Sequence, residues 1–153
     1  MKKLLEKQVV FSATLKLLAF LGQRSAFNGL TYRLTTWVAN LNLYLNKPPR
    51  SKSAADLAKT WKSLMPPDGQ DHFKISNVDE QTAYTEIHLH CPLRGTGNTE
   101  ACYKLMNYDR TLMEQVGGQL IVLESQSNSG NNFCKLAIRS AKADTSDLKP
   151  AHT

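Results

Sequence analysis

Three cysteines, Cys91, Cys102 and Cys134, are the residues of this sequence best suited to chemistry. Thiolates bind zinc and other soft metals, and they act as nucleophiles when their pKa is lowered. However, the sequence has no C-x-x-C pair, and free cysteine is also among the most buried residue types. The spacing therefore leaves three interpretations open: core residues, metal ligands or a reactive thiol.

A few other side chains could join the cysteines. Glu124 ends an apolar run, QLIVLE, where a carboxylate must be paired, protonated or bound, unless the strand turns to solvent there. His88 and His90 would share one face of a strand, where they could chelate a metal or simply be exposed. The glycine-rich stretch 95–97 precedes a predicted helix and could surround an anion, but it lacks the lysine of a P-loop, which favours a capping turn. No nucleophile-elbow motif supports a Ser-His-Asp site.

The second half of the chain, 66–140, is predicted to form a small antiparallel sheet with one helix packed across it. The helix begins at Asn98 or Thr99 and ends at Val116, before two glycines. Alternation places Cys134 on an inward face, and helical spacing places Cys102 on the buried side of the helix. The expected strands are 72–78, 82–91, 119–125 and 132–140.

The first half, 1–65, is predicted to be helical, with a helix pair at 4–21 and 25–46 and a short helix at 54–65. Steps of three and four residues in the second helix make an apolar seam, which could pack on the chain's own sheet or on a second copy. The seam consists of Phe27, Leu30, Leu34, Trp37, Leu41 and Tyr44. We therefore expect a single α+β domain over residues 1–140, with a flexible tail at 141–153.

Charge and composition restrict the function classes. The first 65 residues hold eleven Lys and Arg against two acids (+9), and the remainder holds eight against eleven (−3). The basic residues are scattered and no nucleic-acid motif is present, so a nucleic-acid partner is not expected. No apolar run is long enough for a membrane span, and charges at 6, 7 and 16 interrupt the N-terminal stretch that resembles a signal peptide. An odd number of unpaired cysteines favours a cytoplasmic protein.

With these elements in order, the sequence from about Phe73 to Arg139 resembles the 4-vinyl reductase domain family. These are small-molecule-binding domains of bacteria and archaea, which also occur in the sensor modules of phenol-responsive transcription regulators. The resemblance implies a ligand-binding domain whose preceding helices help to form a homodimer.

The resemblance also implies a zinc site. In the phenol sensors, zinc is held by a cysteine near the helix start, a glutamate ending the next strand, a cysteine shortly after it and a cysteine opening the last strand. These positions fall on Cys102, Glu124, Ser127 and Cys134, so three of four ligands are kept, and serine is a poor zinc ligand. Three outcomes are compatible with this set: an open position, loss of the metal, or completion by His90 or Cys91.

A second resemblance supports an enzymatic alternative. Cys91-Pro92 and the run from Gly130 to Cys134 are similar to small hydrolases of the 2-amino-thiazoline carboxylate hydrolase type. This implies a cytoplasmic hydrolase with Cys91 or Cys102 as nucleophile, which requires a lowered thiol pKa.

Our first hypothesis is binding rather than catalysis. We expect a homodimer that holds a small apolar or aromatic molecule between the Cys102 helix and the sheet, because such pockets are mostly apolar with a few placed polar groups. The residues expected to line this pocket are Trp37, Tyr84, Leu105, Met106, Tyr108 and Leu112.

Overall fold

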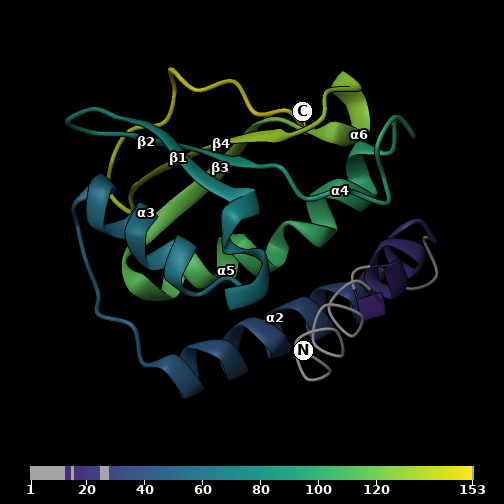
Figure 1. Cartoon of the computed structure of the whole chain (residues 1–153), viewed down its shortest axis with the longest axis horizontal. Coiled ribbons are helices and arrows are strands. Elements are labelled where there is room, and N and C mark those ends of the chain that lie inside the picture. Colours follow the sequence, from purple (N-terminus) through teal and green to yellow (C-terminus); the bar gives the residue numbers. More distant parts are fainter. Residues whose placement is uncertain (1–12, 15, 25–27, 153) are drawn as a thin grey trace.

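The computed structural model describes residues 13–14, 16–24 and 28–152, and it confirms the predicted α+β fold. A four-stranded antiparallel sheet carries helices on one face, and the segment after the last strand crosses the other face (Figure 1). The helices are α2 (Asn28–Asn46), α3 (Ala54–Ser63), the 3-10 helix η2 (Pro67–His72), α4 (Thr99–Leu105), α5 (Asn107–Val116) and α6 (Gln126–Ser129). The strands are β1 (Phe73–Val78), β2 (Ala83–Ile87), β3 (Gly118–Glu124) and β4 (Cys134–Ser140).

The sheet is built around β4. The strand order is β1-β2-β4-β3, with all neighbours antiparallel, so β1 and β3 are the edges. Side chains alternate along a strand, and Cys134, Leu136 and Ile138 of β4 are buried on the side of the helices. Ladder irregularities lie between Ile75 and Asn77 in β1 and between Val122 and Glu124 in β3.

The helices form two layers beneath the sheet. α3 and α5 pack on the strands, and α2 lies outside them, against α5 and α4 (Figure 1). Trp61 of α3 meets Phe73 of β1 edge to face, with ring centroids 5.5 Å apart. One cluster of buried residues contains side chains from both the helical half and the sheet half, so the two halves share a core.

Several predicted boundaries differ from the structure. The helix expected from 98 to 116 is two helices, α4 and α5, because the backbone turns at Met106. β2 ends at Ile87, so His88 and His90 do not share a strand face. Residues 13–14 and 16–22 are helical, but the rest of the first predicted helix lies outside the described residues, as does Phe27. No helix in the described part of the chain is long and apolar enough to cross a bilayer.

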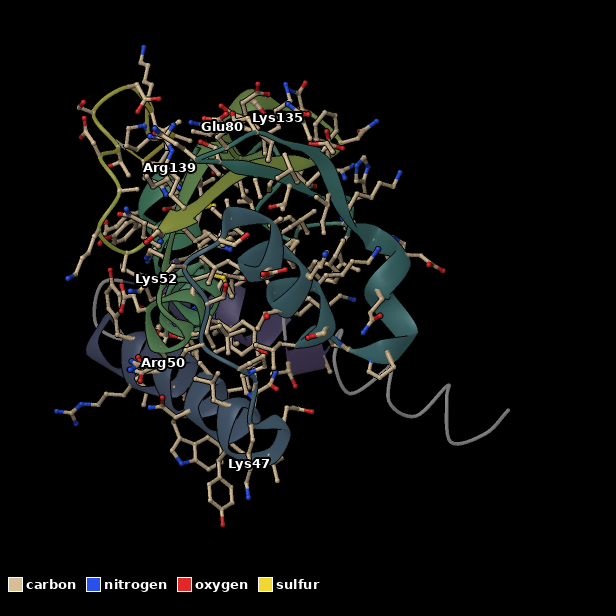
Figure 2. The ribbon with its side chains drawn as sticks, turned by 90° about the vertical axis from the view of Figure 1, so that its left-hand side faces the viewer. Lys47, Arg50, Lys52, Glu80, Lys135 and Arg139 are labelled. Carbon is tan, nitrogen blue, oxygen red and sulfur yellow. The ribbon has the colours of Figure 1, made fainter. Side chains whose placement is uncertain are left out.

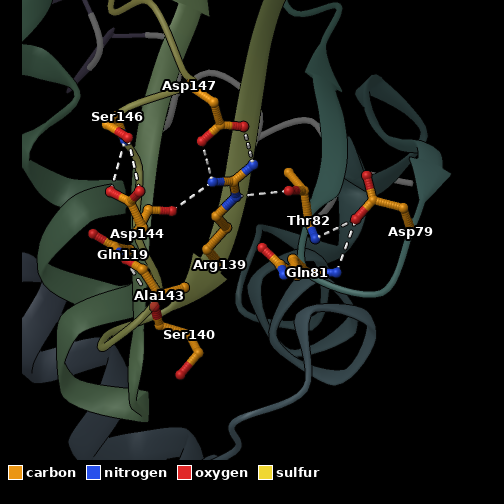
Figure 3. Close-up of polar contacts among 10 residues, drawn as sticks. All are labelled: Asp79, Gln81, Thr82, Gln119, Arg139, Ser140, Ala143, Asp144, Ser146 and Asp147. Carbon is orange, nitrogen blue, oxygen red and sulfur yellow. Dashed lines mark hydrogen bonds and ion pairs between the residues drawn. The ribbon is translucent and has the colours of Figure 1, made fainter.

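The segment after Ser140, predicted to be a flexible tail, makes specific contacts with the sheet, and Figure 3 shows those of residues 143–147. Arg139, only 5% exposed, donates two hydrogen bonds to the carboxylate of Asp147, at 2.6 and 2.7 Å, and one to the hydroxyl of Thr82. The backbone N–H of Ala151 donates to the carbonyl of Val122 on the β3 edge at 2.8 Å. These contacts explain why an outward-facing arginine is buried.

The turn from α5 to β3 depends on glycine. Gly117 has φ 95°, and a Cβ built there would lie 2.8 Å from the carbonyl oxygen of Ser51. Gly130 also has a positive φ, 70°, but a Cβ there would meet nothing within 4 Å. Substitution of Gly130 therefore reports the free-energy cost of backbone strain alone. Substitution of Gly117 reports the strain and the steric clash together.

We predict that Gly117→Ala lowers the free energy of unfolding by about 3 kcal/mol, whereas Gly130→Ala lowers it by about 1 kcal/mol. Left-handed strain acts at both positions, and the clash with Ser51 acts only at Gly117. Urea unfolding of the two variants and the wild type gives the comparison. Equal losses of unfolding free energy would show that the backbone at Ser51, in the connector before α3, moves away from the added methyl group at little cost.

Candidate functional site

The three cysteines gather where α4, β4 and the loop after β2 meet. Cys102 and Cys134 are buried and Cys91 is half-buried, and no disulfide joins them. The hydroxyls of Ser125 and Ser127 bond to the Cys102 thiol. Ser127 stands at the one zinc-ligand position of the resemblance that lacks a good metal-binding side chain. It does lie beside Cys102.

Gln126, which the sequence did not single out, organises the surrounding loops. Its side chain is buried; the amide oxygen accepts from the Arg94 guanidinium at 2.7 Å, and the amide nitrogen donates to the Leu89 carbonyl at 2.8 Å. The N–H groups of Gly95 and Gly97 donate to the carbonyls of residues 126 and 127. The glycine-rich loop therefore braces α6, and these two N–H groups are not directed at an anion.

Glu124 lies apart from the cysteines. The irregularity after Val122 changes the alternation of β3, so Glu124 pairs with Lys135 on the outer face, with Nζ to Oε1 at 2.9 Å. Hydrogen bonds from Lys135 and Asn131 hold the pKa of Glu124 below its usual range. Lys135 is also the register partner of Glu86, so the three charges form a cross-strand row.

This arrangement does not fit the zinc ligands that the family resemblance implies, namely Cys102, Glu124 and Cys134. Two thiols lie together, but the carboxylate is committed elsewhere and serine is a poor ligand. Among the described residues, no three His, Cys, Asp or Glu side chains form a group that could hold a metal ion. Zinc stays a prediction of the resemblance.

The environment of the thiols disfavours nucleophilic chemistry. Burial raises the pKa of Cys102 to about 12 and that of Cys134 to about 11. Burial also raises the pKa of Cys91 above its ordinary value. A thiol that stays protonated at neutral pH is a poor nucleophile.

The six residues predicted to line a pocket are dispersed. Trp37 is 63% exposed on the outer side of α2, and Tyr84 is on β2, whose inner side is occupied by Ala83 and Thr85. Met106 and Leu112 are buried in the core. The remaining two are partly buried against that core, namely Leu105 and Tyr108.

The surface of the described chain includes two clefts of moderate size. The first, about 440 Å³, lies between the end of β3, α6 and the C-terminal segment. The second, about 340 Å³, runs along α2 and includes Trp37. The second cleft, called here the α2 groove, is lined by Tyr32, Arg33, Thr36, Trp37 and Asn40.

The most unusual feature of α2 is that its apolar seam faces away from the rest of the described chain. The inward side consists mostly of small or polar residues, including Thr31, Thr35 and Ala39, which are all buried, and Leu43 packs against the core beside them. The sequence left open whether the seam packs on the sheet, and the structure shows that it does not. The exposed apolar residues of the helix are Leu30, Trp37, Leu41, Tyr44 and Leu45, with Leu34 partly exposed beside them.

Hydrogen bonds, together with the packing of Leu43 against the core, fix the inward side of α2. Asn42 donates to the carbonyl of Leu64 at 2.9 Å and to the hydroxyl of Tyr108 at 2.5 Å. Asn107, directly after the turn at Met106, donates to the hydroxyls of Thr35 and Thr36. The orientation of α2 is therefore well determined by polar contacts with α3 and α5.

The core also contains a carboxylate. Asp109 of α5 accepts a hydrogen bond from the indole nitrogen of Trp61 at 2.8 Å and is buried between α3, α5 and the sheet. Burial raises its pKa from 3.8 to about 6, although the bond from Trp61 opposes that shift. The group therefore ionises in the folded protein near neutral pH.

Comparisons of the chain with protein-family models, with curated proteins and with solved structures found no match. The function proposed below therefore depends on the residues and contacts described above.

We predict that native protein at pH 7 reacts with a thiol reagent only at Cys91, because Cys102 and Cys134 are buried and protonated. Their labelling should be slower than that of free cysteine by about a thousandfold. Mass spectrometry of peptides after timed alkylation gives the rates, and urea-unfolded protein, with all three thiols accessible, is the control. Fast labelling of Cys102 in the folded state would contradict the assignment and favour the hydrolase.

We predict that Asp109→Asn stabilises the protein at neutral pH. An acid with a raised folded-state pKa contributes its stability below pH 3.8 and loses it as pH rises through about 6. The variant should gain about 3 kcal/mol over the wild type between pH 4 and pH 7.5, and little more above that. Urea unfolding across this range tests the slope, with Glu114→Gln on the exposed side of α5 as the control. A gain that does not vary with pH would show that Asp109 titrates normally.

Proposed function

We propose that this protein is a small-molecule-binding domain that acts as a homodimer, with the seams of two α2 helices packed together. The observation that carries the proposal is the exposed apolar seam of α2, in which Trp37 is 63% and Tyr44 is 73% exposed. Monomeric proteins rarely expose a continuous apolar patch larger than a few hundred Å². A surface of this kind is typical of an interface.

The size of the seam fits a second copy. Its exposed side chains present on the order of 600 Å², and a standard interface buries about 800 Å² on each partner. The helical residues 16–22 add two exposed side chains, Leu17 and Phe20. The seam of α2 by itself therefore supplies most of the area that a standard interface needs on each partner.

The charges of α2 also favour self-association. α2 has no acidic residue in its first turn and no basic residue in its last, and Arg33 is its only charged side chain. Two seams can therefore meet without burying an unpaired charge, which would oppose association. The basic residues Lys47, Arg50 and Lys52 lie beyond the end of α2, on the connector to α3 (Figure 2).

For the ligand, we propose a small apolar or aromatic molecule. The predicted site between the Cys102 helix and the sheet is filled by core side chains, so the α2 groove is the better candidate, because it is lined by Trp37 and Tyr32. Three free thiols support a reducing compartment, and we propose the cytoplasm.

We predict that the wild type sediments as a dimer of twice the 17.1 kDa chain mass and that Leu41→Glu is monomeric. The change places a carboxylate in the middle of the seam twice per dimer, which should weaken association at least about 100-fold. Analytical ultracentrifugation over a range of protein concentrations measures this.

The matched control is Val78→Glu, which makes the same type of change at an exposed apolar residue of β1, far from α2 in the fold. Val78→Glu should stay dimeric, and both variants should keep the circular dichroism of the wild type. A wild type that remains monomeric at the highest concentration would refute the dimer.

A further inference from the structure

The larger of the two clefts, called here the C-terminal cleft, is formed by three separate parts of the chain. Residues 123–124 at the end of β3, 128–129 of α6 and 149–151 of the C-terminal segment line it, and its volume is about 440 Å³. Ligand clefts in proteins commonly have volumes of about 300–1,000 Å³, so this one has room for a small molecule. It shares no lining residue with the α2 groove.

Hydrogen bonds hold the three walls of the C-terminal cleft together. The backbone N–H of Ala151 donates to the carbonyl of Val122 on β3 at 2.8 Å, and the side-chain amide of Asn128 donates to the carbonyl of Ala151 at 3.0 Å. The hydroxyl of Ser125 donates to the amide oxygen of Asn128 at 2.8 Å, which fixes the other end of that side chain. A ligand therefore does not have to order these walls, which lowers the entropic cost of binding.

Two side chains of opposite charge line the cleft. Glu124 contributes a carboxylate, and hydrogen bonds from Lys135 and Asn131, both at 2.9 Å, fix its position. Each carboxylate oxygen receives one of these bonds, so each keeps a lone pair that can accept another. Lys149 contributes an ammonium group from the C-terminal segment, and it forms no ion pair with another described residue.

This lining suits a small zwitterion with an apolar body. An ammonium can donate to the carboxylate of Glu124, and a carboxylate can accept from the ammonium of Lys149. Such charge-assisted hydrogen bonds are stronger than bonds between neutral groups. Leu123 and Pro150 add apolar surface to the same cleft. An α-amino acid with an apolar side chain combines the three complementary groups in one small molecule.

We propose that the C-terminal cleft binds an α-amino acid with an apolar side chain. The ammonium of the ligand lies on Glu124, its carboxylate lies on Lys149, and its side chain packs against Leu123 and Pro150. This site goes beyond the proposed dimer and its α2 groove, because every lining residue comes from one chain and none comes from α2.

The test uses L-phenylalanine and L-leucine as probes, with isothermal titration calorimetry on the full chain. Two analogues of L-phenylalanine each lack one charge: N-acetyl-L-phenylalanine lacks the ammonium, and L-phenylalaninamide lacks the carboxylate. The wild type should bind one L-phenylalanine per chain, at least about tenfold more tightly than either analogue.

Two variants assign the two charges separately. Lys149→Gln should bind L-phenylalanine at least about tenfold more weakly and lose the preference over L-phenylalaninamide, whose missing carboxylate no longer matters. Glu124→Gln should instead lose the preference over N-acetyl-L-phenylalanine. The matched control is Lys142→Gln, which removes a positive charge from an exposed position of the same segment outside the cleft and should keep both preferences.

The outcomes separate this site from the dimer. No binding of either amino acid at millimolar concentration would overturn the inference, and so would binding whose preferences are unchanged in Lys149→Gln and Glu124→Gln. Leu41→Glu should bind L-phenylalanine as tightly as the wild type, because the cleft does not include α2. A monomeric wild type that binds L-phenylalanine would refute the dimer and support this site.

Discussion

The outward-facing apolar seam of α2 is the constraint that dominates this structure. A helix in an outer layer normally packs its most apolar side on the core and turns its polar side to water. In α2 the order is reversed, since Thr31 and Thr35 are buried while Trp37 and Leu41 are exposed. Hydrogen bonds from Asn107 to threonine hydroxyls and from Asn42 to Tyr108 hold this orientation. Rotating the seam inward would break those bonds and bury large side chains against a layer already filled by α5. The seam is therefore left exposed among the described residues.

The rest of the fold explains why no part of the described chain covers that seam. α3 and α5 occupy the helical face of the sheet, and the C-terminal segment crosses the opposite face (Figure 1, Figure 3). This segment is anchored by Arg139 and by a backbone hydrogen bond to β3, so both faces of the central strand β4 are covered within the chain. The faces of the sheet are therefore covered within the chain, whereas the seam of α2 is exposed among the described residues.

Local patterns in the sequence predicted the elements well and the directions of some side chains poorly. Alternation correctly placed Cys134 inward, because β4 is regular along its length. The family resemblance placed Glu124 with the cysteines, but the irregularity after Val122 shifts the register by one position, and the carboxylate pairs with Lys135. The two-residue alternation of side chains along a single strand does not reveal a β-bulge, because a bulge depends on how that strand pairs with its neighbour. The seam of α2 was visible in the spacing, yet its direction depends on polar contacts with residues about 70 positions away, such as Asn107.

The positions of the positive charges are compatible with the proposed dimer, although the first half of the chain is strongly basic. Lys47, Arg50 and Lys52 follow the end of α2 on the connector to α3 (Figure 2), so they lie outside the apolar seam. Exposed charges outside an interface are screened by salt, with a Debye length of about 8–10 Å, and oppose association only weakly. Arg33 is the one charged residue of α2, and its side chain is exposed at the α2 groove beside the seam. It can therefore keep its hydration when two seams pack together, and the desolvation cost of a buried, unpaired charge does not arise.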